Sequence, residues 1–212
     1  MNERERIAAA MVDLCFEHGY RQTTPEMLFD RAEVDRAGFR RHFADLEDCF
    51  CEVYKEMRDD LMARVAAAVE YEATWRDGLR ATAYTMVDWT TEDEKRTKFT
   101  VIEVRSAGER ALILMGQAFE ELFDLIDRGR DERQLPGEIS RATAEAIGGT
   151  IFNQMYAAYE DGSIDAVRAK VPEMMYMAVR PYLGDEAAAE ELREPPRPSE
   201  DQEQIPIERR DR

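Results

Sequence analysis

The run TTPEMLFDRAEVDRAGFRRHF, from Thr23 to Phe43, constrains the fold of this chain more than any other stretch. It fits two short helices joined by a tight turn. Either Thr23 or Thr24 can cap the first helix with its hydroxyl, and Asp35 can cap the second. Phe39 and Phe43 in the second helix recur at i, i+4, as residues on one buried face do. The run therefore predicts a helix-turn-helix.

The second helix of this motif is basic, whereas the chain as a whole is strongly acidic. Arg36, Arg40, Arg41 and His42 follow one another closely, although the net charge is −17. Net charge weakens long-range attraction to DNA, while local charge sets the contacts that are made. The pattern favours a discriminating DNA-binding regulator with salt-sensitive affinity and weak non-specific binding.

An apolar helix precedes the motif and stops at Gly19, a helix-ending signal. With this helix included, the first fifty to sixty residues resemble the amino-terminal domain of the tetracycline-repressor (TetR) family of transcriptional regulators. The resemblance implies a homodimeric regulator, most simply a repressor, that binds a palindromic DNA operator. The matching residues are Ile7, Ala10, Leu14, Phe16, Gly19, Tyr20, Thr23, Thr24, Leu28, Ala32, Val34, Phe39, His42, Phe43 and Glu47.

Five residues depart from the family pattern. The family usually has a small residue at Phe29, glycine at Glu33, serine at Asp35, tyrosine at Arg40 and lysine at Leu46. A non-glycine residue with positive φ in the turn costs on the order of 1 kcal/mol. The departures at Phe29, Glu33 and Asp35 leave open an alternative, a helical ligand-binding or interaction dimer that has lost DNA binding.

The DNA contacts are expected at the start and along the exposed side of the second helix. Arg36, with Ala37 and Gly38, is expected to approach base edges. Contacts to phosphates or to the groove are expected from Thr24, Arg40, Arg41 and His42, and Phe39 completes the predicted set.

The rest of the chain predicts an all-α protein of about nine helices. Residues 1–47 are expected to form the DNA-binding domain, and residues 48–184 an effector-binding and dimerisation domain. The segment 94–107 contains strand-like residues but is expected to be helical, since no partner strand is evident. Residues 185–212 are acidic and poor in apolar side chains, which predicts a disordered tail.

Two glycines inside the eighth helix, Gly148 and Gly149, predict a close helix crossing, because glycine otherwise destabilises a helix by about 1 kcal/mol. In the family, two such helices from each subunit form a four-helix bundle, which implies a dimer interface here. Packing within one chain is the alternative. The expected interface residues are Gly148, Gly149, Phe152, Tyr156, Met174, Met175 and Tyr182.

Apolar side chains of the fifth to eighth helices could enclose a small hydrophobic or aromatic effector. The candidates are Tyr84, Met86, Trp89, Phe99, Ile102, Met115, Phe119, Phe123 and Phe152. Core packing is the ordinary role of such residues. Glu103 and Arg105 interrupt an apolar run, so each is either paired or ligand-directed if buried, and otherwise lies on a solvated face.

Other functions have little support. No apolar run is long enough to span a membrane, and the start of the chain lacks a signal-peptide core. Three cysteines, an odd number, favour a reducing cytoplasm over a disulfide framework. No zinc-type spacing, phosphate-cradling loop or nucleophile motif is evident, so we expect no metal, no cofactor and no catalytic residue. A small helical enzyme is the weakest alternative.

Overall fold

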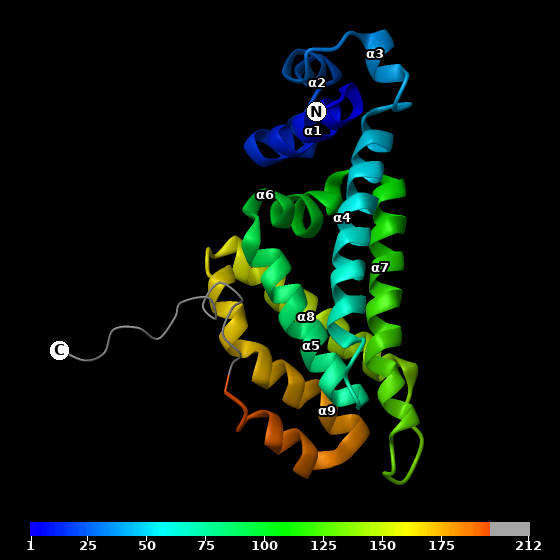
Figure 1. The fold of residues 1–212 in the computed structure, drawn as a ribbon, viewed down its shortest axis with the longest axis vertical. Helices are drawn as coiled ribbons and strands as arrows, with labels where there is room; N and C mark the ends of the chain where they lie inside the picture. Colours follow the sequence, from blue (N-terminus) through cyan, green and yellow to red (C-terminus); the bar gives the residue numbers. More distant parts are fainter. Residues whose placement is uncertain (196–212) are drawn as a thin grey trace, which may run out of the picture.

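A computed structural model describes residues 1–195, and within them the protein is helical without a strand, which confirms the predicted all-α class. A helix-turn-helix unit forms one end of an elongated molecule, and the long helices α4 and α7 run side by side from it (Figure 1). The helices are α1 (Glu3–His18), α2 (Pro25–Ala32), α3 (Arg36–Arg40), α4 (Leu46–Val69), α5 (Trp75–Glu92), α6 (Glu94–Thr97), α7 (Glu109–Asp127), α8 (Arg141–Glu160) and α9 (Val167–Glu191).

Side-chain caps define the helices of the amino-terminal unit. The cap of α2 is Thr24, whose hydroxyl oxygen accepts from the Met27 amide at 3.3 Å. Thr23 is buried instead, and its hydroxyl donates to the Gly19 carbonyl at 3.0 Å. Asp35 caps α3, as predicted, by accepting from the backbone N–H of its third residue.

The turn between α2 and α3 has the left-handed geometry that the family usually builds with glycine. Glu33 has φ 53° and ψ 51°, and among residues 1–195 it is the only non-glycine residue with positive φ. This conformation costs an L-residue roughly 1–2 kcal/mol. The turn therefore survives the departure at Glu33 at the expense of some stability.

Two hydrophobic cores divide the molecule. The first combines α1–α3 and the first half of α4 with Phe99, Val104, Ala107 and Ala111. The second lies among α5, α7, α8 and α9. The helix-turn-helix unit therefore does not have a core of its own that ends near residue 47, because residues from beyond position 98 complete it.

The segment expected as one helix over 94–107 is helical but irregular. The short α6 passes into a π-helical turn (Lys98–Ile102) and then a 3₁₀ turn (Glu103–Ser106). Consecutive β-branched residues, Thr100, Val101 and Ile102, crowd the preceding turn of a regular α-helix, which is consistent with the looser winding.

The predicted start of the disordered tail is wrong. Gly184 breaks the helix with φ 90° and ψ 179°, but residues 185–191 form further helical turns and Glu191 is 1% exposed. Arg80 holds that carboxylate through bonds of 2.9 and 2.6 Å, and Arg76 also binds it. These partners lie more than a hundred residues away in sequence, so local composition could not reveal them. Residues 196–212 of the predicted tail lie outside the described residues.

We expect Glu191→Gln to destabilise the protein strongly, because two largely buried guanidiniums lose their shared anion. Removing one member of a buried ion pair costs about 3 kcal/mol or more, and for a chain of this size that lowers Tm by at least roughly 6 °C. Glu190→Gln is the matched control, since Glu190 binds Arg76 but is half exposed. Thermal melting should show a small change for this control. Equal falls in Tm for the two variants would contradict the assignment.

Candidate nucleic-acid interface and apolar cavity

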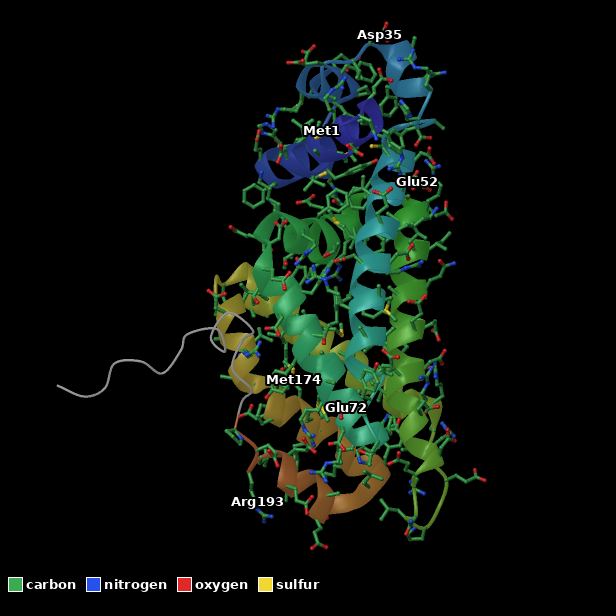
Figure 2. The ribbon with its side chains drawn as sticks, in the orientation of Figure 1. Met1, Asp35, Glu52, Glu72, Met174 and Arg193 are labelled. Carbon is green, nitrogen blue, oxygen red and sulfur yellow. The ribbon has the colours of Figure 1, made fainter. Side chains whose placement is uncertain are left out.

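The short helix α3 forms the free end of the molecule, where Asp35 marks the tip in Figure 2. Three of its five residues, Arg36, Ala37 and Arg40, are exposed. The Arg36 side chain is 70% exposed, and its only ion-pair contact within residues 1–195 is with Glu26 at 4.0 Å. This face therefore presents cations that a polyanion can reach.

Two predicted contact residues point inward. Phe39 is 4% exposed and packs against Phe29 and Phe43, with ring centroids 5.4 and 5.7 Å apart. Gly38 is buried too, and an added Cβ would lie 3.2 Å from the carboxylate of Asp35. Neither residue can present a side chain to DNA, so their assignment as contacts is wrong. The aromatic cluster also explains the large residue at position 29, which fills space beneath α3.

An acidic residue of α1 partly neutralises the basic end of α3. The Glu3 carboxylate lies 2.9 Å from Nη2 of Arg41 and 3.0 Å from Nε2 of His42. The hydrogen bonds from these two side chains, Arg41 first, hold the pKa of Glu3 below its usual range. Arg41 nevertheless stays 61% exposed. Its guanidinium is thus oriented at the surface rather than buried.

The predicted effector residues do not surround one cavity. Phe99 is buried in the first core, stacked on Phe50 with centroids 4.1 Å apart. Met115 packs against that core, and Ile102 is half-buried in the π-helical turn. Phe119 contacts Phe123 and Phe152 in an aromatic cluster between α7 and α8.

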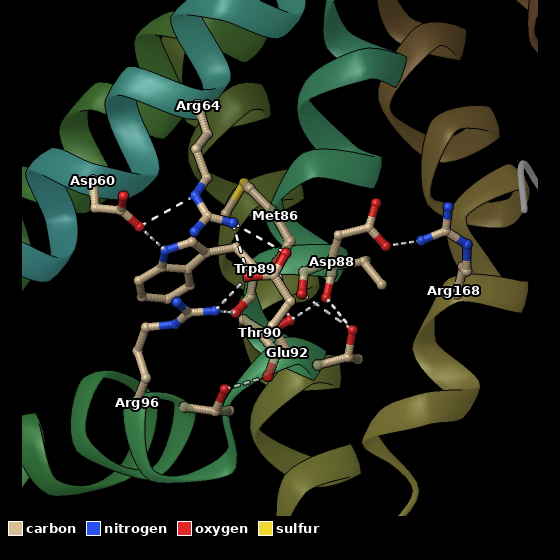
Figure 3. Close-up of polar contacts among 12 residues, drawn as sticks. Asp60, Arg64, Met86, Asp88, Trp89, Thr90, Glu92, Arg96 and Arg168 are labelled. Atoms are coloured by element: carbon tan, nitrogen blue, oxygen red, sulfur yellow. Dashed lines mark hydrogen bonds and ion pairs between the residues drawn. The ribbon is translucent and has the colours of Figure 1, made fainter. Parts of the chain in front are cut away.

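Tyr84 and Trp89 of α5 contact charged side chains of the protein. Trp89 donates its indole N–H to Asp60 at 2.8 Å, and the Arg96 guanidinium lies 4.2 Å from the ring centroid (Figure 3). Tyr84 packs beneath the guanidinium of Arg168. Their aromatic surfaces are therefore occupied by charged side chains of the protein.

The two charged candidates have opposite environments. Glu103 is 7% exposed and accepts a hydrogen bond of 2.7 Å from the Tyr20 backbone N–H. Arg105 is exposed, and its guanidinium lies 5.0 Å from the ring centroid of Tyr156 in α8. Neither residue borders the cavity described next, so a ligand-directed role for them is not supported.

A small cavity of about 40 Å³ lies within the second core among α5, α7, α8 and α9. Of the predicted effector residues, only Met86 lines it. Methionines and aliphatic side chains form almost the whole wall, and no aromatic residue contributes. The lining residues are Leu79, Thr82, Ala83, Met86, Val87, Leu122, Ile126, Ile151, Met155, Val167, Met174, Met175 and Ala178.

The cavity is much smaller than ordinary ligand sites, which commonly enclose about 300–1,000 Å³. Its four methionines have flexible side chains that can repack around a guest. Sequence reasoning missed most of this wall because it favoured aromatic residues. The three closely spaced methionines of α9, Met174, Met175 and Met177, were the available signal.

The predicted dimer residues divide between the interior and the surface. Met174, Met175 and Tyr182 are buried within their own chain, at 6%, 2% and 0% exposure, so their assignment to an interface is wrong. A Cβ on Gly148 would collide with the Phe123 ring, so this glycine permits the α7–α8 crossing inside one chain. Gly149 has open space above it.

Helix α7 also has a glycine with open space beside it. Gly116 likewise has nothing within 4 Å of a built Cβ. On the same helix Leu112 is 44% exposed and Ile113 56% exposed. Phe152 and Tyr156 of α8 are half-buried. This set, called the α7–α8 face below, is an apolar surface with glycine on both helices.

Within residues 1–195 no helix combines the length and the apolar character needed to cross a membrane. No family model matches the sequence, and no curated protein matches it. Similarity is instead found among solved structures.

The fatty acid degradation regulator FadR from Bacillus halodurans superposes with a TM-score of 0.71 at 16% identity, covering 84% of this chain and 95% of that one. FadR from Bacillus subtilis, solved with stearoyl-CoA, gives 0.70 at 16% identity over 82% and 97%. A tetR-family regulatory protein from Rhodococcus RHA1 gives 0.64 at 17% identity over 84% and 97%. The chain therefore has the fold of TetR-type transcriptional regulators.

Proposed function

We propose that this protein is a DNA-binding transcriptional regulator, acting as a ligand-responsive repressor that binds a palindromic operator as a homodimer. The exposed Arg36 and Arg40 on a helix-turn-helix at the free end of a TetR-type fold carry this proposal. One α3 from each subunit would enter successive major grooves. The acidic remainder of the chain limits non-specific binding.

Within this proposal the residues have distinct roles. Arg36 and Ala37 at the start of α3 approach base edges, where arginine pairs with guanine. Thr24, Arg40, Arg41 and His42 contact phosphates or the groove wall. Gly38 and Phe39 are assigned no contact, since both are buried and shape the helix from beneath.

A bound sequence is first selected from a random DNA pool. Arg36→Ala and Arg41→Ala should then have different kinds of effect on DNA binding. Loss of a base-reading arginine costs about 1–3 kcal/mol and relaxes specificity at one position, whereas loss of a phosphate contact weakens all sequences and flattens the salt dependence. Binding titrations at several salt concentrations measure both effects.

Arg31→Ala is the control for that experiment, because its guanidinium is bound to Glu17 near the far end of α1. Unchanged affinity in both test variants, with the fold preserved, would refute the assignment of Arg36 and Arg41. Absence of any enriched sequence for the native protein would favour the alternative that DNA binding has been lost. The acids Glu3, Glu26 and Glu33 around α3 add to the family departures that motivate this alternative.

We place the dimer interface on the α7–α8 face rather than on α8 and α9. Burial of Met174 and Tyr182 leaves α9 with few free apolar side chains, whereas α7 exposes Leu112 and Ile113. Gly116 of α7 and Gly149 of α8 have no side chain, so the helices of a symmetry-related subunit can approach these backbones closely. Association would bury apolar surface that is otherwise in water.

Gly149→Leu should therefore convert the dimer to a monomer at micromolar concentration with little loss of helix content. Gly148→Ala is the matched variant, since its Cβ meets Phe123 of the same chain. It should lower Tm and leave the dimer intact. Sedimentation velocity with circular dichroism separates these results. A dimeric Gly149→Leu protein would exclude the α7–α8 face.

The effector we propose is a flexible aliphatic chain that enters the second core. The cavity wall is aliphatic and methionine-rich, with no aromatic lining residue on which a planar ring would stack. FadR from Bacillus subtilis, of the same fold, was solved with stearoyl-CoA. Binding would enlarge the cavity and favour a dimer whose α3 helices are wrongly spaced for the operator.

Laurate should raise the Tm of the native protein, because a ligand that binds only the folded state stabilises it, by about 2.7 kcal/mol at a hundred times its Kd. Ala83→Leu adds bulk to the cavity wall. This variant should therefore need at least about ten times more laurate for the same rise in Tm. Benzoate serves as the aromatic comparison. A Tm rise with benzoate and none with laurate would reverse the proposed ligand class.

A further inference from the structure

The junction between the helix-turn-helix unit and the body contains two similar contacts that face in opposite directions. In each, a glutamate of one part reaches a backbone turn of the other part. Both turns contain a left-handed glycine, Gly19 with φ 79° and Gly108 with φ 113°. Each carboxylate accepts from a backbone N–H one or two residues after that glycine.

The first contact runs from the body to the helix-turn-helix unit. Glu103 lies in the 3₁₀ turn after the π-helical segment, and its Oε2 accepts from the Tyr20 N–H at 2.7 Å. A Cβ built on Gly19 would lie 3.4 Å from the same oxygen. Glu103 is 7% exposed and has no ion-pair partner within residues 1–195. The hydrogen bond from the Tyr20 N–H is therefore what mainly offsets the cost of burying its carboxylate.

The second contact runs the other way. Glu47, in the first turn of α4, accepts from the Arg110 N–H at 2.7 Å with its Oε1. A side chain at Gly108 would collide with the Glu47 carboxylate, so the contact requires glycine there. The Arg110 guanidinium adds bonds to Asp45 and Asp48, which fastens the start of α4 to the start of α7.

We infer that Glu103 and Glu47 form a reciprocal clasp that sets the orientation of the helix-turn-helix unit on the body. One contact alone would act as a pivot. Two contacts at separate places, the end of α1 and the start of α4, restrict rotation about either one. Because α3 is attached through α1 and α4, the clasp determines where the recognition helix of each subunit points.

The clasp does not border the cavity, but one series of neighbouring residues connects the two. Arg105, two residues after Glu103, lies over the ring of Tyr156, and the neighbouring Met155 lines the cavity. A guest that displaces Met155 would move Tyr156 and the 3₁₀ turn that carries Glu103. This step rests on the proposed function, whereas the clasp itself does not.

Amide hydrogen exchange of the full chain, without DNA, tests the clasp directly. In Glu103→Ala we expect exchange at least about tenfold faster at Tyr20 and, because the contacts cooperate, also faster at Arg110. Glu47→Ala should produce the same pair of changes. Glu109→Ala, an exposed acid beside the junction, is the control and should change neither amide.

Glu103→Gln keeps an acceptor oxygen and should retain most of the protection, which separates loss of the clasp from general unfolding. If each alanine variant exposes only its own amide, or if neither amide is affected, the clasp is refuted. If the native protein binds an operator, laurate should lower its affinity for that operator. The same laurate concentration should lower the operator affinity of Glu103→Ala by a smaller factor. Failure of operator binding in the native protein would refute the proposed function and leave the exchange result intact.

Discussion

The stack of Phe50 on Phe99 joins the two halves of this molecule, and the arrangement of the remaining elements depends on it. Phe50 belongs to α4 and Phe99 to the π-helical turn, and both are fully buried with ring centroids 4.1 Å apart. Burial of two aromatic rings contributes several kcal/mol, of which ring geometry adds about 0.5–1.5 kcal/mol. The core of the helix-turn-helix unit is thereby completed by the body.

This shared core has a mechanical consequence. The unit cannot be regarded as a freely tethered domain, because residues such as Val104 and Ala111 of the body are part of its interior. The polar contacts of Glu103 and Glu47 lie around the same junction and specify orientation, which apolar packing alone specifies less sharply. The helix-turn-helix unit is therefore attached to the body through a packed core rather than through a flexible linker.

The exposed arginines of α3 lie at one end of a chain that is acidic overall. Arg36 and Arg40 are exposed on α3, while Glu3 restrains Arg41 and His42. Elsewhere many cations are paired, and the pair of Arg76 and Arg80 with Glu191 holds the end of α9 in the core. In an acidic chain this arrangement makes binding depend on close contacts rather than on long-range attraction.

The sequence by itself determined the helical class, the cap at Asp35 and the turn at Glu33, because these depend on neighbouring residues and local backbone geometry, while it left Thr23 and Thr24 as alternative caps of α2. It also located the basic helix. Only the tertiary structure decided which side chains face inward. Met174 and Tyr182 are buried within their own chain, the cavity has an aliphatic wall, and Glu191 pairs with Arg80 more than a hundred residues away. Helical periodicity identifies an apolar face but does not say whether the same chain or a partner covers it, since that depends on contacts between residues far apart in sequence.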